Sequence, residues 1–283
     1  TMDGSGNAMA VWVQTGDPNL GSPDAQNGVW ANRYALGSGW SANPMDIRGP
    51  GQLGSADSSQ VAMDGFGNAM AVWVQRNHVF ANRYSLGSVW SRLNTLQIEA
   101  NTGSALNPQV GMDAFGNAMA VWMQNNHIWA KRFIASTLRW EESASQIESN
   151  LGTASNPQVA MDGSGNAMAV WVQDNHVWAN RYAAGSDWSP NNATRIETNN
   201  GAASNPKVAM DASGNAIAVW TQGIDVWANR YVVGRGWSTA TLLENSPEPA
   251  ANPQVAVNAS GNATVVWVQS DGKSISVWAN GFN

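Results

Sequence analysis

The stretch Asp162–Tyr182 reads DGSGNAMAVWVQDNHVWANRY, and it decides the fold. Its middle alternates strictly, and successive side chains of an extended strand point to opposite faces. Ala169 and Trp171 therefore fall on one face, and Met168 and Val170 fall on the other. This period of two predicts a β-strand rather than an amphipathic helix.

Turn residues bound this strand on both sides. Gly163–Gly165 supply a tight turn, because glycine adopts positive φ without steric cost, and Asp174–Asn175 make a second turn. A short apolar strand, Pro157–Asp162, precedes the first turn, and a third strand, His176–Tyr182, follows the second. A fourth strand opens at Trp188. The segment predicts a four-stranded antiparallel meander.

The whole chain repeats this unit. Its entry motif, DGSGNAMAVW in the first copy, recurs with spacings of 61, 49, 49, 49 and 47 residues. The six copies begin at Asp3, Asp64, Asp113, Asp162, Asp211 and Asn258. A four-stranded unit repeated every 40–50 residues, roughly, is typical of a propeller blade. We therefore predict an all-β, six-bladed β-propeller of four-stranded antiparallel blades, a single domain over residues 1–283, with repeats starting near 1, 60, 109, 158, 207 and 254.

The two ends leave the closure of the ring open. Repeat one keeps only Thr1–Asp3 of its first strand, and repeat six stops after its third strand. Either residues are missing, or the last blade is incomplete, or another chain supplies strands that cover the edge. A seven-bladed ring is the alternative if a repeat is missing. Repeat one also carries an insertion, Thr15–Asn27, with Asp17 and Asp24, which we interpret as a surface loop.

Composition and charge exclude several classes of function. The 283 residues include 16 Trp and 28 Gly, but only 14 basic and 20 acidic side chains. The net charge of −6 disfavours a nucleic-acid partner, which needs a basic surface. The chain has no Cys, which excludes disulfides, thiolate zinc sites and a Cys nucleophile. No run of about 18 apolar residues occurs, so we expect no membrane insertion, and no motif indicates a cofactor.

The tryptophans fall into three columns of the repeat. The second-strand column is Trp12, Trp73, Trp122, Trp171, Trp220 and Trp267, and the third-strand column is Trp30, Trp129, Trp178, Trp227 and Trp278, with Phe80 in repeat two. Both columns lie inside alternating strands, which favours packing between blades. The fourth-strand column is Trp40, Trp90, Trp140, Trp188 and Trp237. It follows a loop near the rim, where a ring can either pack or stack on a sugar.

A column of arginines runs through the third strand. It comprises Arg33, Arg83, Arg132, Arg181 and Arg230, and Gly281 breaks it in repeat six. A planar, permanently charged guanidinium can grip diols or carboxylates with two parallel hydrogen bonds. The alternative is a structural role, either stacked on a neighbouring Trp or paired with an acidic column after the fourth strand, which is Glu99, Glu148, Glu197 and Glu244.

Two further columns have simple structural interpretations. The Asp that opens each repeat stands in a D-x-x-G-N turn, where its side chain caps the turn through the backbone. The ligand spacing of a calcium loop is absent. His78, His127 and His176 occupy one equivalent position in repeats two to four. They belong to different blades, so we expect a surface turn and no metal site.

The motifs DGSGNAMAVWVQ, HVWANRY and GSDWS resemble a widespread family of bacterial propeller-like repeats. The resemblance covers the whole chain, and its GNAxAVW and VWANRY cores are specific. It implies a bacterial protein that is secreted or exposed at the cell surface. It implies no known activity.

The chain also resembles, more weakly, the tandem-repeat propeller lectins of the fucose-binding and tectonin types. It shares their short blade and a Gly-x-Gly-Trp entry to the last strand, at Gly37–Trp40 and Gly234–Trp237. In the fucose-binding type an Arg, a Glu and a Trp hold the sugar between blades. This chain also repeats an Arg, a Glu and a Trp, but the strands that carry them differ from those of the fucose-binding family.

Near-identical repeats imply near-identical sites, which suits multivalent binding. We therefore predict a multivalent glycan-binding protein, with pockets built from the fourth-strand Trp and third-strand Arg columns. In that case Trp188→Ala weakens one site and leaves folding intact. The alternative is a non-catalytic interaction module of a secreted or envelope assembly that contacts other protein chains. A hydrolase or lyase is a third hypothesis, but the nearly intact symmetry predicts no catalytic residues and no enzyme.

Overall fold

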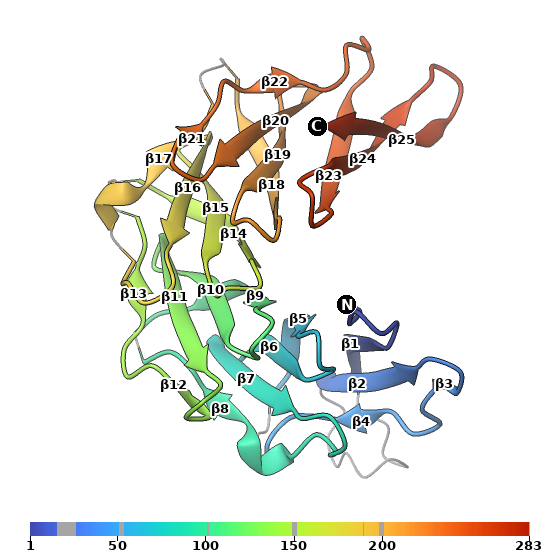
Figure 1. Ribbon diagram of the computed structural model, residues 1–283, viewed down its shortest axis with the longest axis vertical. Helices are drawn as coiled ribbons and strands as arrows, with labels where there is room; N and C mark the ends of the chain where they lie inside the picture. Colours follow the sequence, from blue (N-terminus) through green and yellow to red (C-terminus); the bar gives the residue numbers. More distant parts are fainter. Residues whose placement is uncertain are drawn as a thin grey trace. The chain divides into compact units, whose positions relative to one another are not determined.

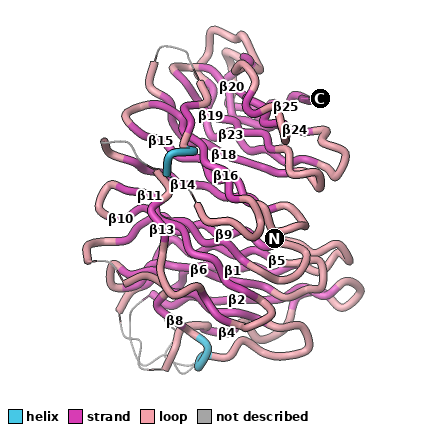
Figure 2. Tube along the Cα trace, turned by 60° about the vertical axis from the view of Figure 1, so that its left-hand side comes forward, coloured by secondary structure: helices cyan, strands magenta, loops and turns pink. Residues whose placement is uncertain are grey.

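The computed structural model of the chain describes residues 1–15, 27–50, 54–100, 102–148, 152–188, 190–197 and 201–282. The inserted loop with Asp17 and Asp24 lies outside them, apart from its two end residues. The regular structure of the described residues is β-strand with two short 3-10 helices, η2 (Arg92–Asn94) and η3 (Pro190–Asn192) (Figure 2). The all-β prediction is confirmed. Neither helix of this described part has the length to span a membrane.

The strands form six antiparallel sheets that follow one another along the chain (Figure 1). Each sheet comes from one sequence repeat, in the order expected for a meander. The chain divides into two compact units, Thr1–Asn125 with Trp129–Ser145, and Asn126–Ile128 with Gln146–Asn283. The number of blades in a ring, and the single domain over the whole chain, stay predictions.

Unit 1 contains most of repeats one to three. Their strands are β1 (Ala8–Thr15), β2 (Asn27–Ala35), β3 (Gly39–Trp40), β4 (Met45–Asp46), β5 (Ala56–Met63), β6 (Ala69–Gln75), β7 (His78–Tyr84), β8 (Leu96–Gln97), β9 (Ala105–Met112), β10 (Ala118–Gln124), β11 (His127–Ile134) and β12 (Arg139–Trp140), with β13 (Ser145–Gln146) at the boundary. Unit 2 contains repeats four to six. Their strands are β14 (Ala154–Met161), β15 (Ala167–Gln173), β16 (His176–Tyr182), β17 (Thr194–Arg195), β18 (Ala203–Met210), β19 (Ala216–Gln222), β20 (Asp225–Val232), β21 (Gly236–Trp237), β22 (Thr241–Leu242), β23 (Ala250–Val257), β24 (Ala263–Ser270) and β25 (Ile275–Phe282).

The aspartate that opens each repeat caps a turn, as predicted. Asp162 Oδ1 accepts the backbone N–H groups of Ser164 and Asn166, both at 2.9 Å, and its Oδ2 accepts the side-chain amide of Asn166 at 2.6 Å. Asn166 also ties this turn to the next one, because its Oδ1 accepts the backbone N–H of Ala184 at 3.0 Å. The same bonds to Asp recur at Asp3, Asp64, Asp113 and Asp211.

The second turn and a bulge both use left-handed residues. Asp174 and Asn175 have φ of 50° and 66°, the pair of positive angles that a two-residue hairpin with the twist of its strands requires. Asn156 has φ of 51° in the first strand, where the register with β15 shifts. Asn tolerates this conformation, and Pro157 has no N–H to lose from the ladder. The Asn-Pro pair therefore makes a bulge that the sequence analysis did not include.

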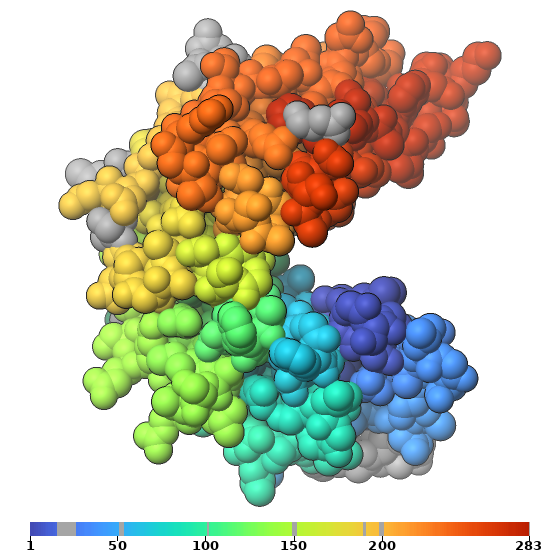
Figure 3. Space-filling model, viewed as in Figure 1, coloured from blue at the N-terminus to red at the C-terminus, as the bar shows by residue number. Residues whose placement is uncertain are grey.

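The core lies between the faces of consecutive sheets. In unit 2, Met168 and Val170 of β15 pack in one cluster with Ala218 and Trp220 of β19. The two faces of the second strand thus carry the residues that the alternation predicts. Trp220 is fully buried, and its indole N–H donates to Gln222 Oε1 at 3.1 Å. The repeat-five sheet packs in turn on the repeat-six sheet, orange and red in Figure 3.

A buried asparagine of the third strand ties the sheets of repeats two and five to the preceding sheet of the same unit. Asn82 Nδ2 donates to the carbonyl oxygen of Ile47 at 2.8 Å. Asn229 makes the equivalent bond in repeat five. A buried backbone acceptor needs a partner, so each amide fixes one sheet on its neighbour.

The fourth strand is shorter and less uniform than predicted. In repeats one, three and five it consists of two-residue pieces, whereas in repeats two and four a 3-10 turn precedes one short strand. The difference follows a left-handed residue within two positions before the Trp, which is Gly39 in repeat one, Leu138 in repeat three and Gly236 in repeat five. Gly236 has φ of 87°, which lets Trp237 pair with Tyr231 in β20. Asp187 occupies that place in repeat four and stays outside the left-handed region, so the chain turns into η3 instead.

Candidate functional site

In the part of the chain that the structure describes, three of the pockets between consecutive sheets are lined by equivalent residues. They lie between repeats one and two, two and three, and four and five, with volumes of about 400, 300 and 590 Å³. Each lies within one unit. Each is lined by the third-strand Arg of one repeat and by an aromatic pair of the next. The sets are Arg33 with Tyr84 and Trp90, Arg83 with Phe133 and Trp140, and Arg181 with Tyr231 and Trp237.

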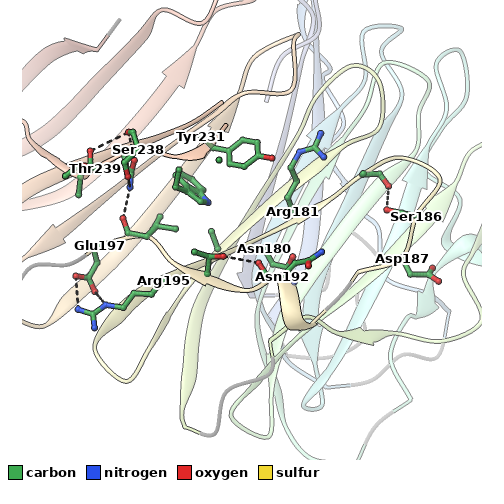
Figure 4. Close-up of a pocket in the computed structure, with 18 residues that line it drawn as sticks. Asn180, Arg181, Ser186, Asp187, Asn192, Arg195, Glu197, Tyr231, Ser238 and Thr239 are labelled. Carbon is green, nitrogen blue, oxygen red and sulfur yellow. Dashed lines mark hydrogen bonds and ion pairs between the residues drawn. The ribbon is translucent and has the colours of Figure 1, made fainter. Parts of the chain in front are cut away.

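The largest of these pockets joins a cationic and aromatic end to an ion pair (Figure 4). At one end the guanidinium of Arg181 lies over the ring of Tyr231, with 5.9 Å from Cζ to the ring centroid. The Tyr231 and Trp237 ring centroids are 5.6 Å apart in an edge-to-face arrangement. At the other end Arg195 Nε lies 3.1 Å from Glu197 Oε1. The pocket therefore offers aromatic faces and hydrogen-bonding groups side by side.

The Arg column faces the next repeat. Arg83 lies over the ring of Phe133 at 5.8 Å, in the same way that Arg181 lies over its tyrosine. The Nε atoms of Arg83 and Arg181 are buried and find no hydrogen-bond acceptor in the described part of the chain. Arg230 differs, because its Nη2 donates to the carbonyl oxygen of Gly261 at 3.0 Å. Arg83 also donates from Nη1 to the hydroxyl of Ser85, so the guanidinium of each of these arginines is held partly by its own surroundings.

The structure corrects the alternative in which the third-strand arginines pair with the acidic column. The His side chains take those carboxylates instead, because His starts the third strand beside the end of the fourth, whereas Arg lies at the far end of the same strand. The separations from His Nδ1 to Glu Oε1 are 2.6 Å for His78–Glu99, 2.7 Å for His127–Glu148 and 2.7 Å for His176–Glu197. Glu244 accepts the side-chain amide of Gln269 at 2.9 Å.

These histidines are half-exposed, but each rests on a carboxylate that is fully buried. Burial of Glu197 opposes its ionisation, yet hydrogen bonds from Arg195, Gln222 and His176 outweigh that effect and lower its pKa. Each His–Glu pair is therefore a specific, partly buried contact, and the histidine is more than part of a surface turn. Across the described ranges, no three His, Asp or Glu side chains gather to hold a metal.

The fourth-strand Trp column divides into two environments. Trp90 and Trp188 are 5% and 8% exposed, so their rings belong to the core. Trp140 and Trp237 are half-buried and line pockets, and Trp40 is 53% exposed. The expectation that Trp188→Ala spares folding is therefore corrected, because that change removes a buried ring. Sequence reasoning missed the distinction because it depends on whether a residue within two positions before the Trp is left-handed, as Gly39, Leu138 and Gly236 are.

Comparisons with known proteins identify the fold of the chain. No protein-family model matches the chain, and no curated protein does. Solved structures do match. An ulvan lyase, described as a new polysaccharide lyase family, has a TM-score of 0.60 at 9% identity, covering 99% of this chain and 77% of that one. An α-L-arabinofuranosidase of Fusarium graminearum has a TM-score of 0.56 at 10% identity, covering 100% and 91%.

A sialidase of Streptococcus pneumoniae is also similar, with a TM-score of 0.55 at 10% identity, covering 99% of this chain and 66% of that one. The chain has a β-propeller fold. At such identities the likeness shows the fold alone, so the resemblances to the bacterial repeat family and to the propeller lectins stay predictions.

One prediction is corrected by these comparisons. The intact repeat symmetry predicts that the chain is not an enzyme, yet the propellers that share its fold are named as a lyase, an arabinofuranosidase and a sialidase. Repeat symmetry in the sequence is therefore no ground for excluding catalysis. Activity on polysaccharides has to be assayed.

Proposed function

We propose that this propeller binds carbohydrate in the pockets between its blades. The observation that carries the proposal is the convergence of a third-strand Arg with a fourth-strand Trp that keeps exposed surface, in three pockets: Arg33 with Trp40, Arg83 with Trp140 and Arg181 with Trp237. Volumes of about 300–590 Å³ suit small ligands, which bind in concave sites with a few polar groups. Propellers of the same fold are named for carbohydrate substrates, which supports the proposal.

The chemistry of the pocket fits a sugar. An aromatic ring offers a flat apolar face to the C–H groups of a pyranose, and the N–H of Trp or the O–H of Tyr at its edge can form a hydrogen bond. A guanidinium can hold two neighbouring hydroxyl or carboxylate oxygens through parallel hydrogen bonds. In the largest pocket Trp237 would supply the ring, Arg181 the donors, and Ser238 and Thr239 further polar atoms.

Only some members of the fourth-strand Trp column and the third-strand Arg column are proposed to contact the sugar. Trp40, Trp140 and Trp237 keep exposed ring surface, whereas Trp90 and Trp188 support the fold from within. The proposed cations are Arg33, Arg83 and Arg181; Arg230 is bonded to the next turn, and Arg132 lines none of the three pockets. Several similar pockets would give avidity for a repetitive glycan. We place this binding in a secreted or cell-surface setting, as the repeat resemblance implies.

A glycan array with free-sugar competition tests the proposal. We expect saturable binding that a simple sugar displaces, and a loss of roughly tenfold or more in affinity for the double variant Trp140→Ala, Trp237→Ala. Trp278→Ala is the matched control, because Trp278 is 43% exposed and lies outside the three pockets. Equal affinity of both variants for the glycan would contradict the proposal. The glycans that bind should also be incubated with the protein and assayed for new reducing ends and unsaturated products.

A further inference from the structure

One position on the first strand breaks the repeat. The residue opposite the second-strand valine is Gln60, Gln109, Gln158, Lys207 and Gln254 in repeats two to six. Four repeats thus carry a neutral amide, and repeat five carries a cation. Since the other repeats fold with Gln at this position, packing does not require the lysine.

The ammonium group of Lys207 lacks a counter-charge. Its Nζ donates to Gln158 Oε1 at 3.3 Å, and it makes no ion pair with any carboxylate that the structure describes. The side chain is half-buried, and burial lowers the pKa of the amine. A partly desolvated charge without a partner is unfavourable, so an incoming anion would gain from it.

The surroundings of Lys207 are polar and accessible. It lies on β18, the edge strand of its sheet, and β18 contacts the neighbouring edge strands β14 and β23 (Figure 1). Gln158 on β14 is oriented by a bond from its Nε2 to the carbonyl oxygen of Pro157 at 2.9 Å. Gln254, the next member of the column, is exposed on β23. An amide therefore lies on each side of the lysine in the column.

We propose that Lys207, flanked by Gln158 and Gln254, is the cation of a second saccharide site that takes the carboxylate or sulfate of an acidic glycan. This inference rests on the proposed carbohydrate function and adds a substrate class to it. The net charge of −6 repels such a glycan in general, so recognition would depend on this local charge. A charge-assisted hydrogen bond from the ammonium is the chemistry that distinguishes an acidic sugar from a neutral one.

The matched variant is Lys207→Gln, which restores the residue of the other four repeats. It removes a half-buried, unpaired charge, so we expect stability equal to the wild type or higher. The control is Lys131→Gln. Lys131 is another half-buried lysine with a lowered pKa, but Glu141 and Glu99 lie near it and raise that pKa in part. Both variants change the net charge equally.

The measurement is calorimetric titration with an oligogalacturonate, with a sulfated oligosaccharide, and with the same oligogalacturonate after its carboxyl groups are reduced. We expect the wild type to bind one or both acidic oligomers, Lys207→Gln to bind them about tenfold more weakly or worse, and Lys131→Gln to bind as the wild type does. The reduced oligomer should not show this difference. Equal affinity of Lys207→Gln and wild type, or no preference of the wild type for the acidic forms, would overturn the proposal.

The double variant Trp140→Ala, Trp237→Ala separates this inference from the inter-blade pockets. If it loses neutral sugars but keeps the part of acidic-glycan affinity that depends on Lys207, both proposals hold. If it binds every sugar as the wild type does while Lys207→Gln loses the acidic ones, the pocket proposal fails and the Lys207 site stands. If inorganic sulfate alone binds at Lys207 and no oligosaccharide does, the site is no saccharide site.

Discussion

The Nδ1 atom of His176 lies 2.7 Å from Oε1 of Glu197, a carboxylate that is fully buried. The same pair occurs in repeats two and three. In repeat five an aspartate, Asp225, takes the place of the histidine beside Glu244. Burial and the nearby charge of Glu244 raise the pKa of Asp225. The contact that is favourable in three repeats is therefore a like-charge contact in the fifth.

Restoring the histidine should stabilise the protein. Asp225→His removes the repulsion with Glu244 and allows the hydrogen bond seen at His176. A substitution toward the repeat consensus is worth about 0.5–2 kcal/mol, and we expect the lower part of that range because Asp225 is only partly buried. Thermal unfolding would show a higher Tm for the variant. A Tm equal to or below that of the wild type would mean that the raised pKa of Asp225 does not reflect repulsion.

The same aspartate predicts a pH dependence. A carboxyl whose pKa is higher in the folded than in the unfolded chain favours folding when it is protonated, and this contribution is lost as pH rises through the folded pKa. Asp225→Asn should therefore raise the free energy of unfolding at neutral pH. The gain over the wild type should shrink as pH falls below the ordinary Asp pKa of 3.8. Urea unfolding at several pH values measures it.

Asp271 provides a control of opposite sign. Hydrogen bonds from the backbone N–H groups of Ser274 and Lys273 lower its pKa. Its carboxylate therefore favours folding above the ordinary Asp pKa, and that contribution disappears as pH falls through the folded pKa. Asp271→Asn should be less stable than the wild type at neutral pH and should converge with it in acid. If both variants shift in the same direction, the difference reflects net charge rather than these two environments.

The glycine before the fourth-strand tryptophan should control the orientation and the exposure of that ring. Gly236 has φ of 87°, where a Cβ atom costs about 1–2 kcal/mol. Gly236→Ala should lower stability by about that amount and weaken sugar binding at Trp237. Gly4→Ala is the control, because Gly4 has ordinary φ and no atom lies within 4 Å of an added Cβ. Chemical denaturation of both variants, followed by sugar titration, measures the two effects; equal stability of the two would contradict this account of the turn.

Substitutions of the aspartate that caps the turn should lower stability to different degrees. Asp162→Ala removes three hydrogen bonds to a charged acceptor, and we expect a cost of about 2–4 kcal/mol. Asp162→Asn should cost less, because Asn258 in repeat six still accepts the N–H groups of Ser260 and Asn262, both at 3.0 Å. Denaturant midpoints give the order. A larger loss for the Asn variant than for the Ala variant would rule out capping as the role of this side chain.

Local signals in the sequence were sufficient for most of the fold. Strict alternation around Trp171 predicted which side chains enter the core, and the glycines and Asp162 predicted the turns. These features depend on a few neighbouring residues, so the sequence contains them in full. The fourth strand was harder to predict, because its course depends on whether a residue shortly before the Trp adopts a positive φ, and in repeat three Leu138 does so although it is not a glycine.

The partners within the site could be predicted less well. The sequence shows that Arg181, His176 and Glu197 recur, but it does not show which of them meet. Their pairing follows from which end of the third strand lies beside the fourth, and from how one sheet lies on the next. The role of Asn229 in tying sheets together was missed for the same reason, since its acceptor belongs to another repeat. Contacts between repeats are set by packing, and sequence columns do not display packing.

A crystal structure with an oligosaccharide that the glycan array selects tests the central claim most directly. The account predicts a sugar ring in the pocket between repeats four and five, stacked on Trp237 and hydrogen-bonded by Arg181, with equivalent density beside Trp140 and Arg83. Sugar bound only away from these pockets, with the pockets empty at saturating ligand, would contradict it.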